Sequence, residues 1–142
     1  MKTLKQLSIF VENKPGAVSA PIQALADAGV NIYTLSIADT ETFGVVRLLV
    51  RDAPAAAAVL EKAGFASKVT DVVAIQVAHA PGSLAKVLAV LDRHQVNVEY
   101  MYAFAAGVDE KAALVFRFAD PEAAIRQIEG ELTVLDGEKL FA

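Results

Sequence analysis

The sequence predicts an α+β protein made of two similar units, and two repeated segments lead to this expectation. Asn13-Lys14-Pro15-Gly16-Ala17 joins a strand-like run to a helical pattern, and His79-Ala80-Pro81-Gly82-Ser83 repeats it at an offset of 66 residues, 81 minus 15. The same offset carries Gly29-Val30-Asn31-Ile32 onto Gln95-Val96-Asn97-Val98. Two motifs that share one offset indicate a duplicated module. We therefore expect one domain in residues 1–71 and a second in residues 72–142.

The length and the apolar content of the chain bear on how these units are stabilised. The 142 residues are enough for one ordinary domain or for two of about 70 residues, and the repeat favours two. A module of that size buries only about 60% of its unfolded surface. The hydrophobic content of 55% is high and indicates extra buried interface. We expect the two copies to pack together or with a second chain.

Composition excludes several classes of function. The chain has no cysteine, which excludes disulfides and thiolate metal sites. Residues 1–6 lack the apolar core of a secretory signal, and no run of about 18 apolar residues predicts a membrane span, so we expect a cytoplasmic protein. The net charge of -4 argues against a nucleic-acid partner, which requires a basic face.

The first copy begins with a strand and a helix. Residues 7–11 alternate apolar and polar side chains, the period of a half-buried strand. After Pro15-Gly16, apolar residues at i, i+3, i+4 and i+7 (Val18, Pro21, Ile22 and Leu25) predict one face of a helix that ends at Gly29. A proline deep in a helix loses a hydrogen bond and clashes with the preceding turn. We therefore expect this helix to begin with Ser19 as its cap.

The remaining elements follow the same order in both copies. In the first copy we expect strands at residues 32–38, 45–50 and 65–71, and a helix that Asp52 caps and that ends at Gly64. In the second copy we expect strands at 73–77, 98–104, 112–118 and 132–135, and helices at 83–94 and 121–129. The order βαββαβ in each copy predicts two ferredoxin-like units, with antiparallel sheets and helices on one face.

The second strand of each unit is expected at a sheet edge, because the crossover rule places the third strand between the first and the second. Residues 32–38 contain no lysine or proline, and residues 98–104 contain only Glu99 as a charge. Neither edge therefore shows the usual protection against pairing. We expect the two edges to pair with each other across a pseudo-twofold axis in an eight-stranded sheet. The alternative is an edge covered by a loop.

The sheet face away from the helices mixes small, polar and aromatic side chains. Its expected members are Gln6, Ser8, Phe10, Thr34, Ser36, Leu49, Ala74, Gln76, Tyr100, Tyr102, Phe104 and Val115. This face is too apolar to remain in water, so we expect two chains to cover it as a homodimer.

The Pro-Gly segments are candidate binding loops. A strand that turns into a helix through Pro-Gly is expected to point the backbone N–H groups of Gly16 and Ala17, or of Gly82 and Ser83, outward at a helix N-terminus. With the helix dipole these groups suit a carboxylate or another small anion, and glycine lets a ligand approach the backbone. A purely structural turn is the alternative interpretation.

Asn31 and Asn97 lie between a predicted helix end and a predicted edge strand. An asparagine there is often a left-handed cap, which is the structural alternative. An amide beside a binding loop can also accept from an ammonium and donate to a carboxylate, the two charged groups of a free amino acid.

The two motifs together resemble the ACT domain, and their duplication resembles tandem ACT proteins over about residues 4–135. The resemblance implies a non-catalytic regulatory protein, without a cofactor, that binds a free amino acid or similar small carboxylate at the interface between paired ACT units. It also implies the ligand contacts, which are Asn13, Lys14, Gly16, Ala17, Asn31 and Ile32 in the first copy and His79, Gly82, Ser83, Leu84, Asn97 and Val98 in the second. His79-Ala80 replaces Asn13-Lys14, so we expect the two sites to be unequal.

Two other classes of function are alternatives to amino-acid binding. Tyr100 and Tyr102 on the open sheet face would suit RNA, but residues 112–118 supply only Arg117 as a base and lack the required pattern. An oligomerisation adaptor with vestigial pockets is the third class. No metal cluster, catalytic triad or phosphate-binding motif is evident, and His94 has no assigned role. The expected partners are an amino acid, a second copy of the chain and a regulated enzyme or other protein.

Overall fold

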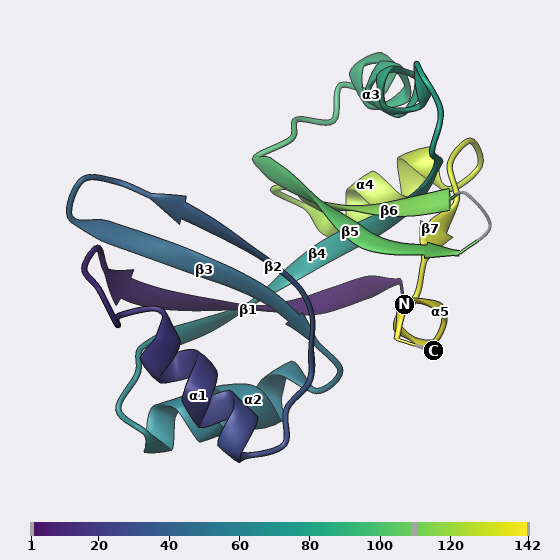
Figure 1. Ribbon diagram of the computed structural model, residues 1–142. Coiled ribbons are helices and arrows are strands. Elements are labelled where there is room, and N and C mark those ends of the chain that lie inside the picture. Colours follow the sequence, from purple (N-terminus) through teal and green to yellow (C-terminus); the bar gives the residue numbers. More distant parts are fainter. Residues whose placement is uncertain (1, 109–110, 142) are drawn as a thin grey trace. The chain divides into compact units, whose positions relative to one another are not determined.

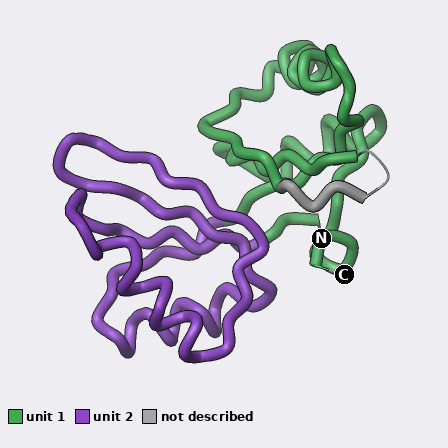
Figure 2. Tube along the Cα trace, viewed as in Figure 1, with its two compact units in different colours: residues 1–4, 71–142 green, residues 5–70 purple. Residues whose placement is uncertain are grey.

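The computed structural model describes residues 2–108 and 111–141, which contain five helices and seven strands (Figure 1). Lys5–Thr70 form one compact unit, here the N-terminal unit, and the other described residues form the C-terminal unit; these are unit 2 and unit 1 in Figure 2. The expected domain boundary between residues 71 and 72 stays a prediction.

The N-terminal unit follows the predicted order. Its elements are β1 (Thr3–Glu12), α1 (Ser19–Asp27), β2 (Ile32–Asp39), β3 (Phe43–Val50), α2 (Ala53–Lys62) and the first part of β4 (Ser67–Ala78). The strands lie in the order β2-β3-β1-β4, and both helices lie on one face of them (Figure 1). That face is buried because alternate strand residues such as Ile9 and Leu48 pack against Leu25 of α1 and Leu60 of α2.

The C-terminal unit repeats the arrangement. Its elements are the last part of β4, α3 (Ser83–Arg93), β5 (Tyr100–Val108), β6 (Lys111–Arg117), α4 (Pro121–Ile128), β7 (Val134–Leu135) and α5 (Gly137–Leu140). The strands lie in the order β5-β6-β4-β7, which matches the first unit position by position. Leu91 of α3 and Ile128 of α4 pack on Ile75 and Phe116 of the sheet. The predicted fold, two ferredoxin-like units with helices on one face of antiparallel sheets, is therefore confirmed.

The helix starts follow local chemistry. Asp52 and Asp120 cap α2 and α4, and each carboxylate accepts a hydrogen bond of 3.1 Å from an N–H of the first turn. The prediction that Ser19 caps α1 is wrong, because Ser19 is the first helical residue and its hydroxyl donates to the Gly16 carbonyl, 3.2 Å away. Pro21 is tolerated because it lies in the first turn, where backbone N–H groups have no partner within the helix.

The two strands expected at residues 65–71 and 73–77 form one continuous strand, β4. No glycine or proline interrupts the sequence between them, so the backbone stays extended. The part from Val73 to Ala78 pairs with β6 in antiparallel register. The last strand of the first copy is thus also the first strand of the second.

The expected pairing of β2 with β5 is wrong. Hydrogen-bonded strands among the described residues follow the order β2-β3-β1-β4-β6-β5, with β7 beside β4. In this order β2 pairs with β3, and β5 pairs with β6, so each stands at an end. The strands of the two copies are therefore joined through β4, which lies between β1 and β6, and not through β2 and β5.

Half of the residues assigned to the open sheet face are buried within a single chain. These residues are Gln6, Ser8, Leu49, Ala74, Phe104 and Val115. The Gln6 side chain donates to the Ser8 hydroxyl across 3.3 Å. Phe10 on the same face is half exposed, and the expected homodimer stays a prediction.

Candidate functional site

Both Pro-Gly segments form the same tight turn. Ala17 N–H donates to the Lys14 carbonyl and Ser83 N–H donates to the Ala80 carbonyl, each across 3.2 Å. Gly16 has φ +83° and Gly82 has φ +84°, the left-handed conformation that the third position of a type II turn requires. The N–H groups of Ala17 and Ser83 are therefore used inside the turns, and the prediction that they point outward for a ligand is wrong.

Polar contacts hold the first loop against the hairpin that joins β2 and β3. The Asn13 backbone N–H donates to Thr42 across 3.0 Å, and its side chain reaches the Glu41 carbonyl at 3.4 Å. Lys14 forms an ion pair of 3.0 Å with Glu12. These contacts give Asn13 and Lys14 a structural role in the first loop.

The second loop presents different side chains to solvent. His79, Gly82 and Leu84 are exposed, and Ser83 is partly buried. The exposed imidazole of His79 occupies the position that Asn13 has in the first copy. The two loops therefore share a backbone conformation and differ in their polar groups.

The loop and the asparagine of one copy lie at opposite ends of a helix. Helix α1 has 9 residues and α3 has 11, so each separates its Pro-Gly turn from its asparagine by roughly 15 Å at 1.5 Å per residue. Within one unit the structure therefore does not bring these predicted ligand residues together. A site that combines the loop of one unit with the asparagine of another stays a prediction.

Neither asparagine is a left-handed cap. The residues with positive φ after α1 and α3 are Gly29, at +76°, and Gln95, at +55°. Among the described residues, Gln95 is the only non-glycine with positive φ. Asn31 and Asn97 follow two residues later and are exposed. The structural alternative for these asparagines is therefore excluded.

Asn31 lines a cavity of about 280 Å³ between the end of α1 and the start of α2. The other lining residues are Gly29, Val30, Tyr33, Arg51, Asp52 and Ala55. An Arg51 Nη2–H donates to the Tyr33 hydroxyl across 3.2 Å. This hydrogen bond, with a smaller contribution from Asn31, lowers the pKa of Tyr33 below its usual value. Ile32, also a predicted contact, packs against the core of the unit.

Asn97 lines a cavity of about 250 Å³ at the equivalent place in the C-terminal unit. Its lining includes Gln95, Ala119, Asp120 and Gln127. Val98, the remaining predicted contact of this copy, packs against the core instead. Two copies of one module thus place an asparagine and a helix-capping aspartate at the same kind of cavity.

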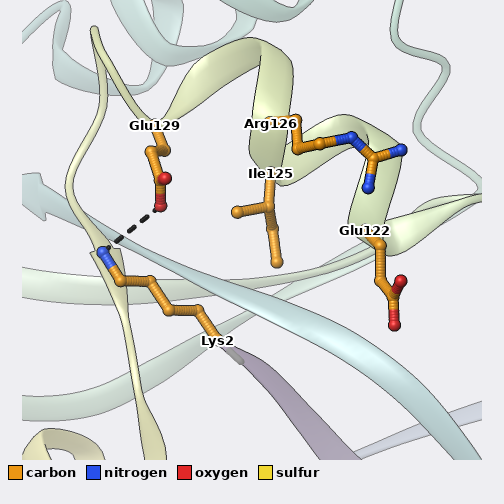
Figure 3. Close-up of a pocket in the computed structure, with 5 residues that line it drawn as sticks. All are labelled: Lys2, Glu122, Ile125, Arg126 and Glu129. Carbon is orange, nitrogen blue, oxygen red and sulfur yellow. Dashed lines mark ion pairs between the residues drawn. The ribbon is translucent and has the colours of Figure 1, made fainter.

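A third cavity, of about 400 Å³, lies beside α4 (Figure 3). Its lining residues are Lys2, Glu122, Ile125, Arg126 and Glu129. Lys2 reaches Glu129 in an ion pair of 3.4 Å, as Figure 3 shows. Two cations and two anions around one isoleucine are typical of a solvated charged surface, and the sequence did not single it out.

No group of three or more His, Cys, Asp or Glu side chains within residues 2–108 and 111–141 is arranged to hold a metal ion. None of the helices found there has the length and apolar character needed to cross a bilayer.

Comparison with known proteins gives a family. The family model described as the ACT domain pair matches residues 2–141. The chain belongs to the ACT domain pair family. The resemblance to the ACT domain seen in the sequence is therefore confirmed. No curated protein matches the sequence.

Solved structures agree with this assignment. The crystal structure of protein BT0572 from Bacteroides thetaiotaomicron is 36% identical, with a TM-score of 0.90, over 99% of this ACT pair and 96% of that chain. The ligand-free regulatory subunit of aspartate kinase from Thermus thermophilus is 19% identical, with a TM-score of 0.64, over 89% and 91% of the two chains. The corresponding subunit from Thermus flavus is 18% identical, with a TM-score of 0.61, over 97% and 92%.

ACT domain pairs are typical of regulatory proteins that bind small molecules, and they are usually not catalytic. For this ACT pair, sequence reasoning found the asparagines but missed Tyr33 and Arg51 beside Asn31. A comparison of the two copies could have identified Arg51. Aligning Asp52 with Asp120 places Arg51 opposite Ala119, which marks a charge present in one copy and absent from the other.

Proposed function

We propose that this ACT pair is a non-catalytic regulatory protein of the cytoplasm that binds a free amino acid or a similar small carboxylate. The observation that supports the proposal most is the duplicated cavity, in which Asn31 and Asn97 stand beside Asp52 and Asp120. An amide supplies both a donor and an acceptor, and a carboxylate accepts from an ammonium. Together these groups complement the charged end of an amino acid.

The Pro-Gly loops complete the proposed site when ACT units pair. Their candidate contacts remain Gly16 and Ala17 in one copy and Gly82 and Ser83 in the other, flanked by the polar side chains of Asn13, Lys14 and His79 and by Leu84. Since the N–H groups of Ala17 and Ser83 are engaged in turns, ligand contacts at the loops would come from the side chains and the remaining backbone groups.

The proposed output is a change in association with another protein. The similar chains from Thermus are named regulatory subunits of aspartate kinase, which are ACT proteins that act on an enzyme. By analogy, we assign this ACT pair a regulated enzyme or other protein as partner, and a homodimer as its working form.

A thermal-shift screen against the twenty amino acids tests the proposal. A ligand at 100 times its Kd should add about 2.7 kcal/mol to the free energy of unfolding. Asn31→Ala and Asn97→Ala should then weaken binding with little loss of fold, because both side chains are exposed. Gln23→Ala is the matched control, since this exposed amide on α1 bonds only Asp27 in the described structure, across 2.8 Å. Unchanged affinity in both asparagine variants would contradict the site.

An adaptor without a ligand is the second candidate. The observation in its favour is on β2, where Leu35 and Ile37 are 51% and 53% exposed. Exposed apolar side chains on a terminal strand suit contact with another protein. Association that persists while no amino acid stabilises the protein would favour the adaptor over the sensor.

A further inference from the structure

The two asparagine-lined cavities share a scaffold but differ in charge. Asn31 and Asn97 correspond at an offset of 66, 97 minus 31, and Asp52 and Asp120 at an offset of 68, 120 minus 52. At the second offset the residue before each aspartate is Arg51 in the N-terminal unit and Ala119 in the C-terminal unit. The lining of the C-terminal cavity contains no lysine or arginine among its described residues.

A second difference lies two residues after each asparagine. Tyr33 of β2 corresponds to Glu99 at the offset of 66, 99 minus 33. Tyr33 lines its cavity, whereas the Glu99 carboxylate forms an ion pair of 3.3 Å with Arg117. The N-terminal cavity therefore has a cation and a phenol where the C-terminal cavity has neither.

Arg51 is oriented by its neighbours. Its Nη2–H donates to the Tyr33 hydroxyl across 3.2 Å, and the pKa of Tyr33 is lowered by this bond first and by the Asn31 side chain to a smaller extent. A guanidinium presents five N–H donors in one plane, so it can hold a phenol and grip a carboxylate through two parallel bonds at the same time. A fixed guanidinium loses less side-chain entropy when a ligand binds.

The anion in the same cavity has a complementary use. The Asp52 carboxylate accepts a bond of 3.1 Å from the Ala55 N–H at the start of α2, which fixes its position. A carboxylate can accept several further hydrogen bonds. The negative charge of Asp52 weakens the attraction of Arg51 for a simple anion. The same charge attracts an ammonium group, so the pair favours a ligand that carries both an ammonium and a carboxylate. The cavity of about 280 Å³ lies just below the usual range of about 300–1,000 Å³, which favours a small ligand.

We propose that the N-terminal cavity holds the α-carboxylate of a small amino acid on Arg51 and its ammonium on Asp52, so that each chain has one tight site. This assignment rests on the proposed amino-acid function and narrows it to one of the two copies. The C-terminal cavity keeps Asn97 and Asp120 but has no cation to bind the carboxylate.

Isothermal titration calorimetry on the full chain tests the assignment. The titrant is the amino acid that gives the largest stabilisation in the thermal-shift screen, together with its carboxamide, which lacks the carboxylate charge. The wild type should bind one equivalent per chain. Arg51→Ala should weaken binding by about 10- to 100-fold, the range for a lost charge-assisted hydrogen bond, and Arg51→Lys should restore part of the affinity. The carboxamide should bind weakly to the wild type and lose little further in Arg51→Ala.

Arg126→Ala is the matched control, because this arginine is also exposed but lies on α4 beside the separate charged cavity. It should leave the affinity unchanged. Equal affinities of the wild type and Arg51→Ala, or two equal sites per chain, would overturn the assignment and leave amino-acid binding in place. Absence of binding to the wild type by all twenty amino acids would instead overturn the proposed function and this assignment together.

Discussion

Replacing Gly16 by alanine separates the needs of a turn from the needs of a ligand. Gly16 has φ +83° in the tight turn, and a Cβ placed on it would meet no heavy atom within 4 Å. The substitution therefore causes no clash, and its cost is the left-handed backbone of a non-glycine residue, about 1–2 kcal/mol. Gly82 has φ +84° and the same open surroundings, so Gly82→Ala should lose the same amount.

Urea unfolding measures this loss. With an m-value of about 2 kcal/mol/M, a typical value for a small protein, the midpoint should fall by roughly 0.5–1 M in each variant. Gly130→Ala is the control, because Gly130 is equally open but has no left-handed φ. Alanine at such a position should leave the free energy of unfolding unchanged or raise it by about 0.4–1 kcal/mol, so the midpoint should stay the same or rise slightly.

The comparison refutes the argument if Gly16→Ala and Gly82→Ala are as stable as Gly130→Ala, since the turns would then not require glycine. Ligand titration of the same variants decides the second question. If glycine serves the turn alone, the folded Gly16→Ala variant should bind the amino acid as tightly as the wild type when no urea is present. A folded variant with weakened binding would show that a ligand approaches this backbone closely, as the sequence interpretation held.

Three further outcomes are expected. Asp120→Ala should cost about 1 kcal/mol by urea unfolding, because it removes the 3.1 Å cap of α4, while Asp120→Asn should retain most of the stability. Leu91→Ala should cost about 2–5 kcal/mol, because Leu91 is 1% exposed, whereas Leu84→Ala on the same helix should stay within about 0.5 kcal/mol, because Leu84 is 43% exposed. Hydrogen bonds from His94 first and then from a neighbouring arginine lower the pKa of Glu131, so its contribution to stability is present above pH 4.5 and is lost as the pH falls through its lower folded value. Glu131→Gln should therefore flatten the fall of the unfolding midpoint below pH 4.5.

Local signals predicted most of the fold. Asp52 and Asp120 each precede a proline in the first turn of a helix; Asp52 caps its helix as expected, and Asp120 caps the equivalent helix. The junction of the two copies was beyond local signals, because a strand that ends and a strand that continues have the same alternating pattern. Only pairing partners distinguish them, and β4 changes partners along its length. The short helix α5, which Asp136 caps, was missed because four residues give no period.

In the candidate site, too, some residues could be found from the sequence and others only from the fold. The repeat singled out Asn31 and Asn97, and both line cavities at equivalent places in the two units, because position in a module determines position in the fold. Arg51 was missed because it lies between a strand and a helix cap, where an exposed charged residue is common and gives no signal in the sequence. Its proposed role rests on the hydrogen bond of 3.2 Å to the Tyr33 phenol of β2, and this contact depends on the pairing of β2 with β3.

The duplication also bears on the proposed regulatory function. The positions that fold each copy, the Pro-Gly turn and the capping aspartate, are the same in both units, whereas the cation beside the asparagine occurs in one. If each chain has the single tight site proposed above, its response is graded and hyperbolic, because cooperativity requires at least two coupled sites. A steeper response would therefore have to come from association between chains, with the sites of two copies coupled through their interface. The exposed Leu35 and Ile37 on β2 offer a surface for such an association, since β2 stands at an end of the strand order. Ligand affinity and the association of chains are then linked, and each must change the other by the same factor.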